Sequence, residues 1–156
     1  MTKKTVEMSV TLKIPDATAL TALRTLREMG FRELKGLQRA VHYRFEIDGN
    51  EQAFKKKIAN VDILVNANKH IASFPHPFGK DDVLLLVTDN DQGDGLAKRL
   101  REQLGVKEVK AATMGTLWAF EISGKNKEAS AQQMAEELLA NRHYQQYRVM
   151  GKHPSK

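Results

Sequence analysis

The sequence contains no cysteine and one tryptophan among its 156 residues. Without cysteine the chain can form no disulfide, no thiolate zinc site and no cysteine nucleophile. The longest unbroken apolar run, Val83 to Val87, is far too short to cross a bilayer. Met1 to Lys4 leads into a strand pattern without the apolar core of a signal peptide. We therefore expect a cytoplasmic protein with no membrane partner.

Motifs for chemistry are equally scarce. The segment Asp91 to Gly95 has neither the spacing nor the lysine of a phosphate-binding glycine loop. The five histidines lack the spacing of metal ligands on one helix or strand. Glu46 and Glu121 occupy matching positions of an internal repeat, which favours a structural role over catalysis. We predict no catalytic residue, no cofactor and no bound metal.

What the sequence does contain is an internal repeat at an offset of 75 residues. Residues 29–47 share six identities in nineteen positions with residues 104–122, whereas composition alone would give roughly one. Tyr43 to Ile47 matches Trp118 to Ile122, and Leu64 to Asn66 matches Leu139 to Asn141. A unit of this size is marginally stable by itself. We therefore expect two copies of one small unit joined in a single chain.

The repeat divides the chain into a first repeat at 1–74, a linker at 75–80, a second repeat at 81–150 and a flexible tail at 151–156. Alternating apolar residues predict strands at 6–14 and 83–87, and helical spacing predicts helices at 19–29 and 96–104. Turns near Arg39-Ala40 and at Met114-Gly115-Thr116 would fold the next strands into hairpins. Helices at 51–65 and 129–140, then strands at 70–74 and 144–150, follow.

The predicted fold class is therefore α+β, with two tandem β-α-β-β-α-β units. Each unit is expected to be an antiparallel sheet with its helices on one face, and the two are expected to pack as an intramolecular pseudo-dimer. The phase of the strands then assigns side chains to the face away from the helices. In the first repeat that face is polar and carries Ser9, Thr11, His42, Arg44 and Glu46. In the second it is apolar and carries Leu84, Leu86, Leu117 and Ala119.

These two faces predict different surroundings. Because a sheet that is apolar on both faces is normally covered on both, the second face should meet the first repeat, a second molecule or a partner. His42 is expected to face solvent or a partner.

The net charge of +6 raises the question of nucleic-acid binding. Such binding favours basic residues concentrated on one face with aromatic side chains between them. Here Lys and Arg are spread along both repeats and mixed with Asp and Glu, and Tyr43, Phe45, Trp118 and Phe120 share the phase of the aliphatic core. An ordinary charged surface with a mild attraction for acidic partners is the favoured interpretation.

Several segments carry a resemblance to a known family. They are Val10-Thr11-Leu12-Lys13, Leu26 to Phe31, Glu33-Leu34-Lys35, the strand Tyr43 to Ile47, and Leu138 to Asn141 followed by Tyr147. Together they resemble PurS, the small subunit of the multi-subunit phosphoribosylformylglycinamidine synthase of bacterial and archaeal purine synthesis. The sequence departs from the family's Arg-x-Gly-Lys-like turn, because Thr113 and Thr116 flank Gly115 where basic residues are expected.

The resemblance implies a non-catalytic subunit that bridges the ATP-dependent synthetase and glutaminase subunits of this amidotransferase. A tandem copy would be a covalent version of the small-subunit dimer, and the fused pair is expected to form a homodimer. Gly115 is expected to shape a hairpin turn. The expected interface residues are Thr11, Lys13, His42, Arg44 and Glu46 on the polar face, Leu84, Leu86 and Leu117 on the apolar face, and Gly115.

Two other functions stay open at this point. One is a regulatory module that binds a small metabolite, since paired α+β units of this kind can hold one at their interface. The other is a basic nucleic-acid-binding protein, prompted by the net charge.

Overall fold

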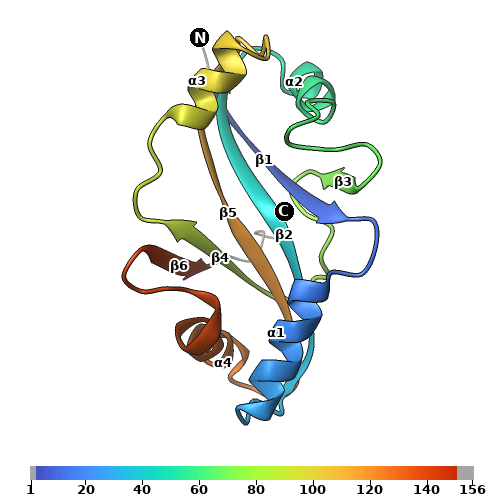
Figure 1. The fold of residues 1–156 in the computed structure, drawn as a ribbon, viewed down its shortest axis with the longest axis vertical. Coiled ribbons are helices and arrows are strands. Elements are labelled where there is room, and N and C mark those ends of the chain that lie inside the picture. Colours follow the sequence, from blue (N-terminus) through green and yellow to red (C-terminus); the bar gives the residue numbers. More distant parts are fainter. Residues whose placement is uncertain (1–2, 151–156) are drawn as a thin grey trace. The chain divides into compact units, whose positions relative to one another are not determined.

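The computed structural model describes residues 3–150, and its elements follow the order β-α-β-α-β twice, the second time with an added π-helix (Figure 1). The first half contains β1 (Lys3–Leu12), α1 (Ala17–Glu28), β2 (Leu34–Asp48), α2 (Glu51–Ile58) and β3 (His70–Ser73). The second half contains β4 (Val83–Asp89), α3 (Gly95–Glu102), β5 (Val109–Ile122), α4 (Lys127–Met134), the π-helix η1 (Ala135–Leu139) and β6 (Gln145–Val149). The predicted α+β class is confirmed.

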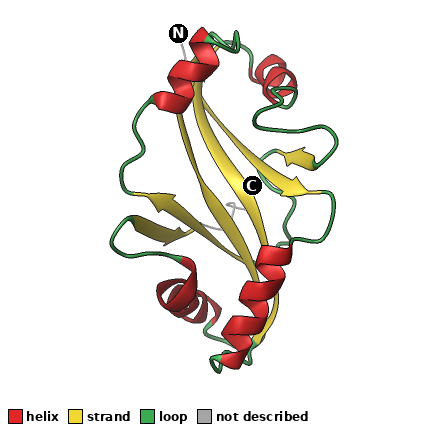
Figure 2. Ribbon diagram, in the orientation of Figure 1, coloured by secondary structure: helices red, strands yellow, loops and turns green. Residues whose placement is uncertain are grey.

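The hairpins predicted inside each repeat are wrong. β2 and β5 are continuous strands of 15 and 14 residues (Figure 2). A tight hairpin turn needs residues with positive φ. Among the described residues, positive φ occurs at five glycines, and neither Arg39-Ala40 nor Gly115 is one of them. The segments predicted as a second and a third strand are therefore the two ends of one long strand.

The strand order is β3-β1-β2-β5-β4-β6, with each strand hydrogen-bonded to its neighbours. β1 pairs antiparallel with β2 and β3, and β4 pairs antiparallel with β5 and β6. The register places Ser9 opposite His42 and, on its other side, opposite Ser73. In the second half it places Leu86 opposite Leu117.

The chain forms two compact units, and each contains parts of both halves of the sequence. Within the described residues, unit 1 consists of 3–14, 41–77 and 91–114, and unit 2 of 15–40, 78–90 and 115–150. β2 and β5 each contribute one end to each unit. The repeat boundaries at 74 and 81 stay a prediction about the sequence, and the compact units do not follow them. The predicted tail at 151–156 lies outside the described residues.

Unit 1 places α2 and α3 on one face of its strands. Phe54 and Ile58 of α2 and Leu100 of α3 are each fully buried and belong to one cluster with Met8 and Phe45. The Phe45 and Phe54 rings meet edge to face with centroids 5.3 Å apart. Each fully buried side chain of this size stabilises the fold by roughly 1.5–3 kcal/mol.

The second helix of the first repeat ends earlier than the sequence predicts. α2 stops at Ile58 rather than reaching Val65. The Asn60 side chain donates to the carbonyl of Lys56 at 2.8 Å, which satisfies a carbonyl at the helix end. The residues that follow include Val61, Asp62 and Ile63, which have low helix propensity, so the apolar stripe continues there without helical structure.

Unit 2 places α1 and α4 on one face of its strands. Leu26 of α1 and Met134 of α4 are fully buried in a cluster that includes Leu85, Trp118 and Phe120. The helix α1 begins where the Asp16 side chain accepts hydrogen bonds from the backbone N–H groups of Thr18 and Ala19. Unit 2 therefore takes its two helices from the two different halves of the sequence, as unit 1 does.

Local hydrogen bonding recurs at the offset of the sequence repeat. In unit 1 the N–H of Asp48 donates to the carbonyl of Glu108 at 3.0 Å, and in unit 2 the N–H of Ser123 donates to the carbonyl of Glu33 at 3.0 Å. Gly30 and Gly105, which end equivalent helices, both have positive φ. The turns before β3 and β6 also match: the Asn66 side chain accepts from Asn68 N, and the Asn141 side chain accepts from His143 N.

Candidate partner-binding surfaces

The polar face expected in the first repeat lies in unit 1, but its centre is buried. His42 is 3% exposed, so the expectation that it faces solvent or a partner is wrong. Its Nε2 lies 2.8 Å from Oε1 of Glu7 on the neighbouring strand β1. The Ser9 hydroxyl beside it is fully buried and has no hydrogen-bond partner among the described residues. The strand phase put His42 and Ser9 on the same face, but it did not predict that both are buried.

The outer part of this face is accessible. Arg44 is exposed, and its guanidinium lies 3.8 Å from the Glu46 carboxylate, which is a loose surface ion pair. Thr11 is half-buried opposite Ile71 of β3. Lys13 lies just beyond the end of β1, is exposed, and donates from Nζ to the carbonyl of Ala67 at 2.6 Å. A role for these four residues in partner binding stays a prediction.

The apolar face expected in the second repeat lies in unit 2 and is largely covered. Leu86 and Leu117 are 4% and 1% exposed, and Ala119 beside them is also buried. Leu84 is half-buried. Leu86 and Leu117 are therefore covered by the chain's own fold. Of the three leucines proposed for a partner contact, Leu84 has the largest exposed fraction.

Gly115 does not shape a hairpin turn. It lies inside β5 opposite Thr88 of β4. A Cβ atom at this position would lie 2.5 Å from the carbonyl oxygen of Val87 and 2.8 Å from a methyl carbon of Thr88. Glycine is therefore required because β4 approaches closely, and not because of a turn.

The ion pair between Arg39 and Asp16 in unit 2 lowers the pKa of the Asp16 carboxyl group. Arg39 Nε lies 2.7 Å from the Asp16 carboxylate. Burial alone would raise the pKa of Asp16, but the hydrogen bond from Arg39, the N–H groups of Ala19 and Thr18 and the charge of Arg39 together hold it below its usual value. The pair joins the start of α1 to β2, so this is a structural feature rather than a reactive carboxylate.

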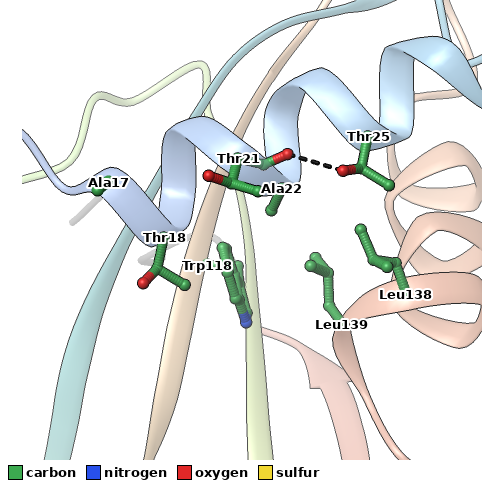
Figure 3. A pocket seen from close by; sticks show the side chains of 8 residues that line it. All are labelled: Ala17, Thr18, Thr21, Ala22, Thr25, Trp118, Leu138 and Leu139. Carbon is green, nitrogen blue, oxygen red and sulfur yellow. Dashed lines mark hydrogen bonds between the residues drawn. The ribbon is translucent and has the colours of Figure 1, made fainter.

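A groove in unit 2 is the feature that sequence reasoning missed. It has a volume of about 470 Å³ and lies between α1 and η1 over the indole of Trp118 (Figure 3). The threonines at 18, 21 and 25 recur along one side of α1, and this spacing was the only signal in the sequence. The groove is lined by Ala17, Thr18, Thr21, Ala22, Thr25, Trp118, Leu138 and Leu139.

No group of three or more His, Cys, Asp or Glu side chains in residues 3–150 could hold a metal ion. None of the described helices is long and apolar enough to cross a membrane.

Comparison with known families bears on the second half of the chain. The family model PurS, described as phosphoribosylformylglycinamidine (FGAM) synthase, matches residues 87–152. We call the matched segment, residues 87–152, the PurS region. It begins within β4 and contains α3, β5, α4, η1 and β6. No curated protein matches the chain.

The match to PurS supports the coarse function implied by the resemblance. PurS is a non-catalytic subunit of FGAM synthase in purine biosynthesis, which agrees with the expectation that this chain is not itself an enzyme. The PurS region covers less than half of the chain, so the nature of the first half is inferred from its repeated structure.

Proposed function

We propose that the chain is a fused, tandem PurS-like subunit that bridges the synthetase and glutaminase subunits of FGAM synthase in the cytoplasm. It carries out no chemical step itself. The observation that carries this proposal is the PurS match at 87–152 together with the same order of strands and α-helices in residues 3–73.

The first half is proposed to be a second PurS-like repeat. β2 and β5 begin 75 residues apart, and so do β3 and β6. The equivalent backbone hydrogen bonds from Asp48 to Glu108 and from Ser123 to Glu33 connect the two long strands in a reciprocal manner. These recurrences are typical of gene duplication followed by divergence, and they favour a covalent replacement for a dimer of single-repeat subunits.

A bridging subunit must contact two unlike partners, and the two units differ in charge. Within the described residues, unit 1 has 13 Lys and Arg against 9 Asp and Glu, a net charge of +4, whereas unit 2 has 10 of each and no net charge. Several basic residues of unit 1 are already paired, including Lys57 with Glu108 at 3.1 Å. Lys56 of α2 is exposed on the same helix. We infer that unit 1 contacts the more acidic of the two partners.

Reconstitution tests the proposal. The protein is mixed with the synthetase and glutaminase subunits from the same organism, and glutamine-dependent formation of the amidine product is measured with and without it. We expect a three-component complex on gel filtration and a glutamine-dependent rate that requires this chain. Ammonia-dependent activity of the synthetase subunit alone serves as the control for a functional active site.

A pair of charge-reversal variants tests the role of unit 1. Lys56→Glu in unit 1 should weaken the complex and reduce the salt dependence of its assembly, whereas Lys125→Glu in unit 2 should change neither. Both lysines are exposed, so neither substitution should affect folding. An active amidotransferase assembled without this chain would contradict the bridging function, and equal effects of the two variants would contradict the assignment to unit 1.

A further inference from the structure

The groove of unit 2 has the composition of a small-molecule site. Its volume of about 470 Å³ lies within the range of roughly 300–1,000 Å³ found for ligand pockets. One wall is the threonine side of α1, the opposite wall is formed by Leu138 and Leu139 of η1, and Trp118 of β5 lies between them (Figure 3). None of the eight described side chains that line it is charged.

Three polar groups around the groove remain available. The Thr25 hydroxyl donates to the carbonyl of Thr21 at 2.9 Å and is therefore occupied. Within residues 3–150, the hydroxyls of Thr18 and Thr21 and the indole N–H of Trp118 have no hydrogen-bond partner. An apolar pocket that contains a few free polar groups is the usual pattern of a site that fixes the orientation of a ligand.

Unit 1 differs from unit 2 at the position equivalent to this groove. Leu26 and Leu100 are equivalent, because each is fully buried and its carbonyl accepts the N–H that follows the helix-ending glycine. Four residues before them are Ala22, which lines the groove, and Leu96, which packs into the core of unit 1. Unit 1 therefore has a leucine side chain where unit 2 has open space.

From these observations we propose that the groove beside Trp118 binds a small, neutral, largely apolar molecule that carries a hydrogen-bond acceptor. Trp118 is 6% exposed, so the ligand contacts Leu139 and the small accessible part of the indole, and an acceptor on the ligand takes a hydrogen bond from Thr21 or from the indole N–H. The absence of charged lining residues disfavours an anion or a cation, because a bound ion would lose hydration without gaining a partner. This site is independent of the proposed bridging function.

Trp118 provides a direct measurement, because it is the only tryptophan in the sequence. The full-length protein is titrated with benzimidazole and adenine as neutral probes and with benzoate as the charged comparison. Binding is followed by tryptophan fluorescence and by the single indole N–H resonance in a ¹H–¹⁵N NMR spectrum. We expect a saturable change with Kd near 1 mM for at least one neutral probe, which is typical of fragments of this size, and at least a tenfold weaker effect of benzoate.

Variants assign the binding to the groove. Ala22→Leu introduces the residue found at the equivalent position of the other repeat and should weaken binding at least tenfold. Thr21→Val removes a hydroxyl at nearly constant volume and should weaken binding about fivefold without filling the groove. Leu20→Ala is the matched control, because Leu20 is 47% exposed on the same helix and does not line the groove.

The possible results decide the proposal. Loss of binding in Ala22→Leu with binding retained in Leu20→Ala supports it. If Ala22→Leu does not fold, weakened binding in Thr21→Val with an unchanged melting temperature supports it equally. The proposal is overturned if no neutral probe gives a saturable change up to about 10 mM, if benzoate binds as tightly as the neutral probes, or if the substitutions at 21 and 22 leave the affinity unchanged.

Discussion

Replacing Gly115 by alanine tests the finding that β5 is one continuous strand. The added methyl group would lie 2.5 Å from the Val87 carbonyl oxygen, 2.8 Å from a Thr88 methyl carbon and 3.2 Å from a Leu86 methyl carbon. The first contact involves the backbone of β4, which cannot move away as a flexible side chain would. β4 and β5 must therefore separate by several tenths of an ångström at the position where Thr88 pairs with Gly115.

The cost follows from two opposing effects. Overpacking of this kind costs about 1–3 kcal/mol, and alanine recovers about 0.4–1 kcal/mol by restricting the unfolded chain. We expect Gly115→Ala to lower the free energy of unfolding by about 1–2 kcal/mol, which corresponds to a fall in Tm of about 2–8 °C for a chain of this length. Urea unfolding should show the same loss as a lower midpoint with an unchanged m-value.

Two other glycines serve as controls. An added Cβ at Gly95, the first residue of α3, would meet nothing within 4 Å, so Gly95→Ala should leave the Tm unchanged or raise it slightly. At Gly36 the nearest atom is Oε1 of Glu121 at 3.1 Å, and this side chain can rotate, so an intermediate effect is expected. If Gly115→Ala were as stable as Gly95→Ala, the close approach of β4 would be refuted.

Three further predictions follow from the structure. Asn50→Ala should lower the free energy of unfolding by about 1 kcal/mol, because the Asn50 side chain accepts a hydrogen bond from Ala53 N. Asn126→Ala is the control and should have little effect, because the Asn126 side chain makes no capping hydrogen bond. Equal changes in Tm for the two variants would contradict this prediction. Because the folded-state pKa of Asp16 is lowered, its stabilisation is present above about pH 4 and is lost as the pH falls through the folded pKa. Asp16→Asn keeps the capping oxygen, so urea midpoints should show a stability loss on acidification that is smaller than in the native protein. Cleavage at a protease site inserted between Gly79 and Lys80 should leave the two fragments together on gel filtration, since each compact unit contains residues from both sides of the cut; separation without denaturant would contradict the interleaved units.

The local elements could be predicted because their signals are local. Alternation of apolar residues gave the positions of β1 and β4, and Gly30 and Gly105 marked the helix ends because both adopt positive φ. The hairpins were wrong because the choice between a turn and a continued strand depends on pairing with distant residues. In the sequence, Gly115 resembles a turn residue. Glycine is required there because the Val87 carbonyl of β4 lies too close for a side chain, and this contact exists only in the folded sheet.

For the candidate surfaces too, the sequence predicts local features but not those that depend on distant contacts. The strand phase put Ser9 and His42 on one face and Leu86 and Leu117 on another, and the structure shows that the members of each pair lie opposite each other. It could not give the burial of His42, because burial depends on what covers the face and not on which face a residue occupies. The groove over Trp118 could not be predicted either, since α1 and β5 come from different repeats and nothing in the sequence places one beside the other.

The interleaving of the halves explains how the two units can differ while the fold persists. The helices of unit 1, α2 and α3, come from different repeats, and so do α1 and α4 of unit 2. Neither repeat alone can therefore complete the core of either unit, and selection for stability acts on the whole chain. Exposed and groove-lining positions are then free to diverge, as with Ala22 against Leu96 or the net charge of +4 in unit 1 against none in unit 2. A symmetric dimer of identical single-repeat subunits cannot acquire such differences, because every substitution appears in both copies. Under the proposed function, fusion of two repeats would provide two unlike surfaces from one repeated fold, as a subunit between two different partners requires.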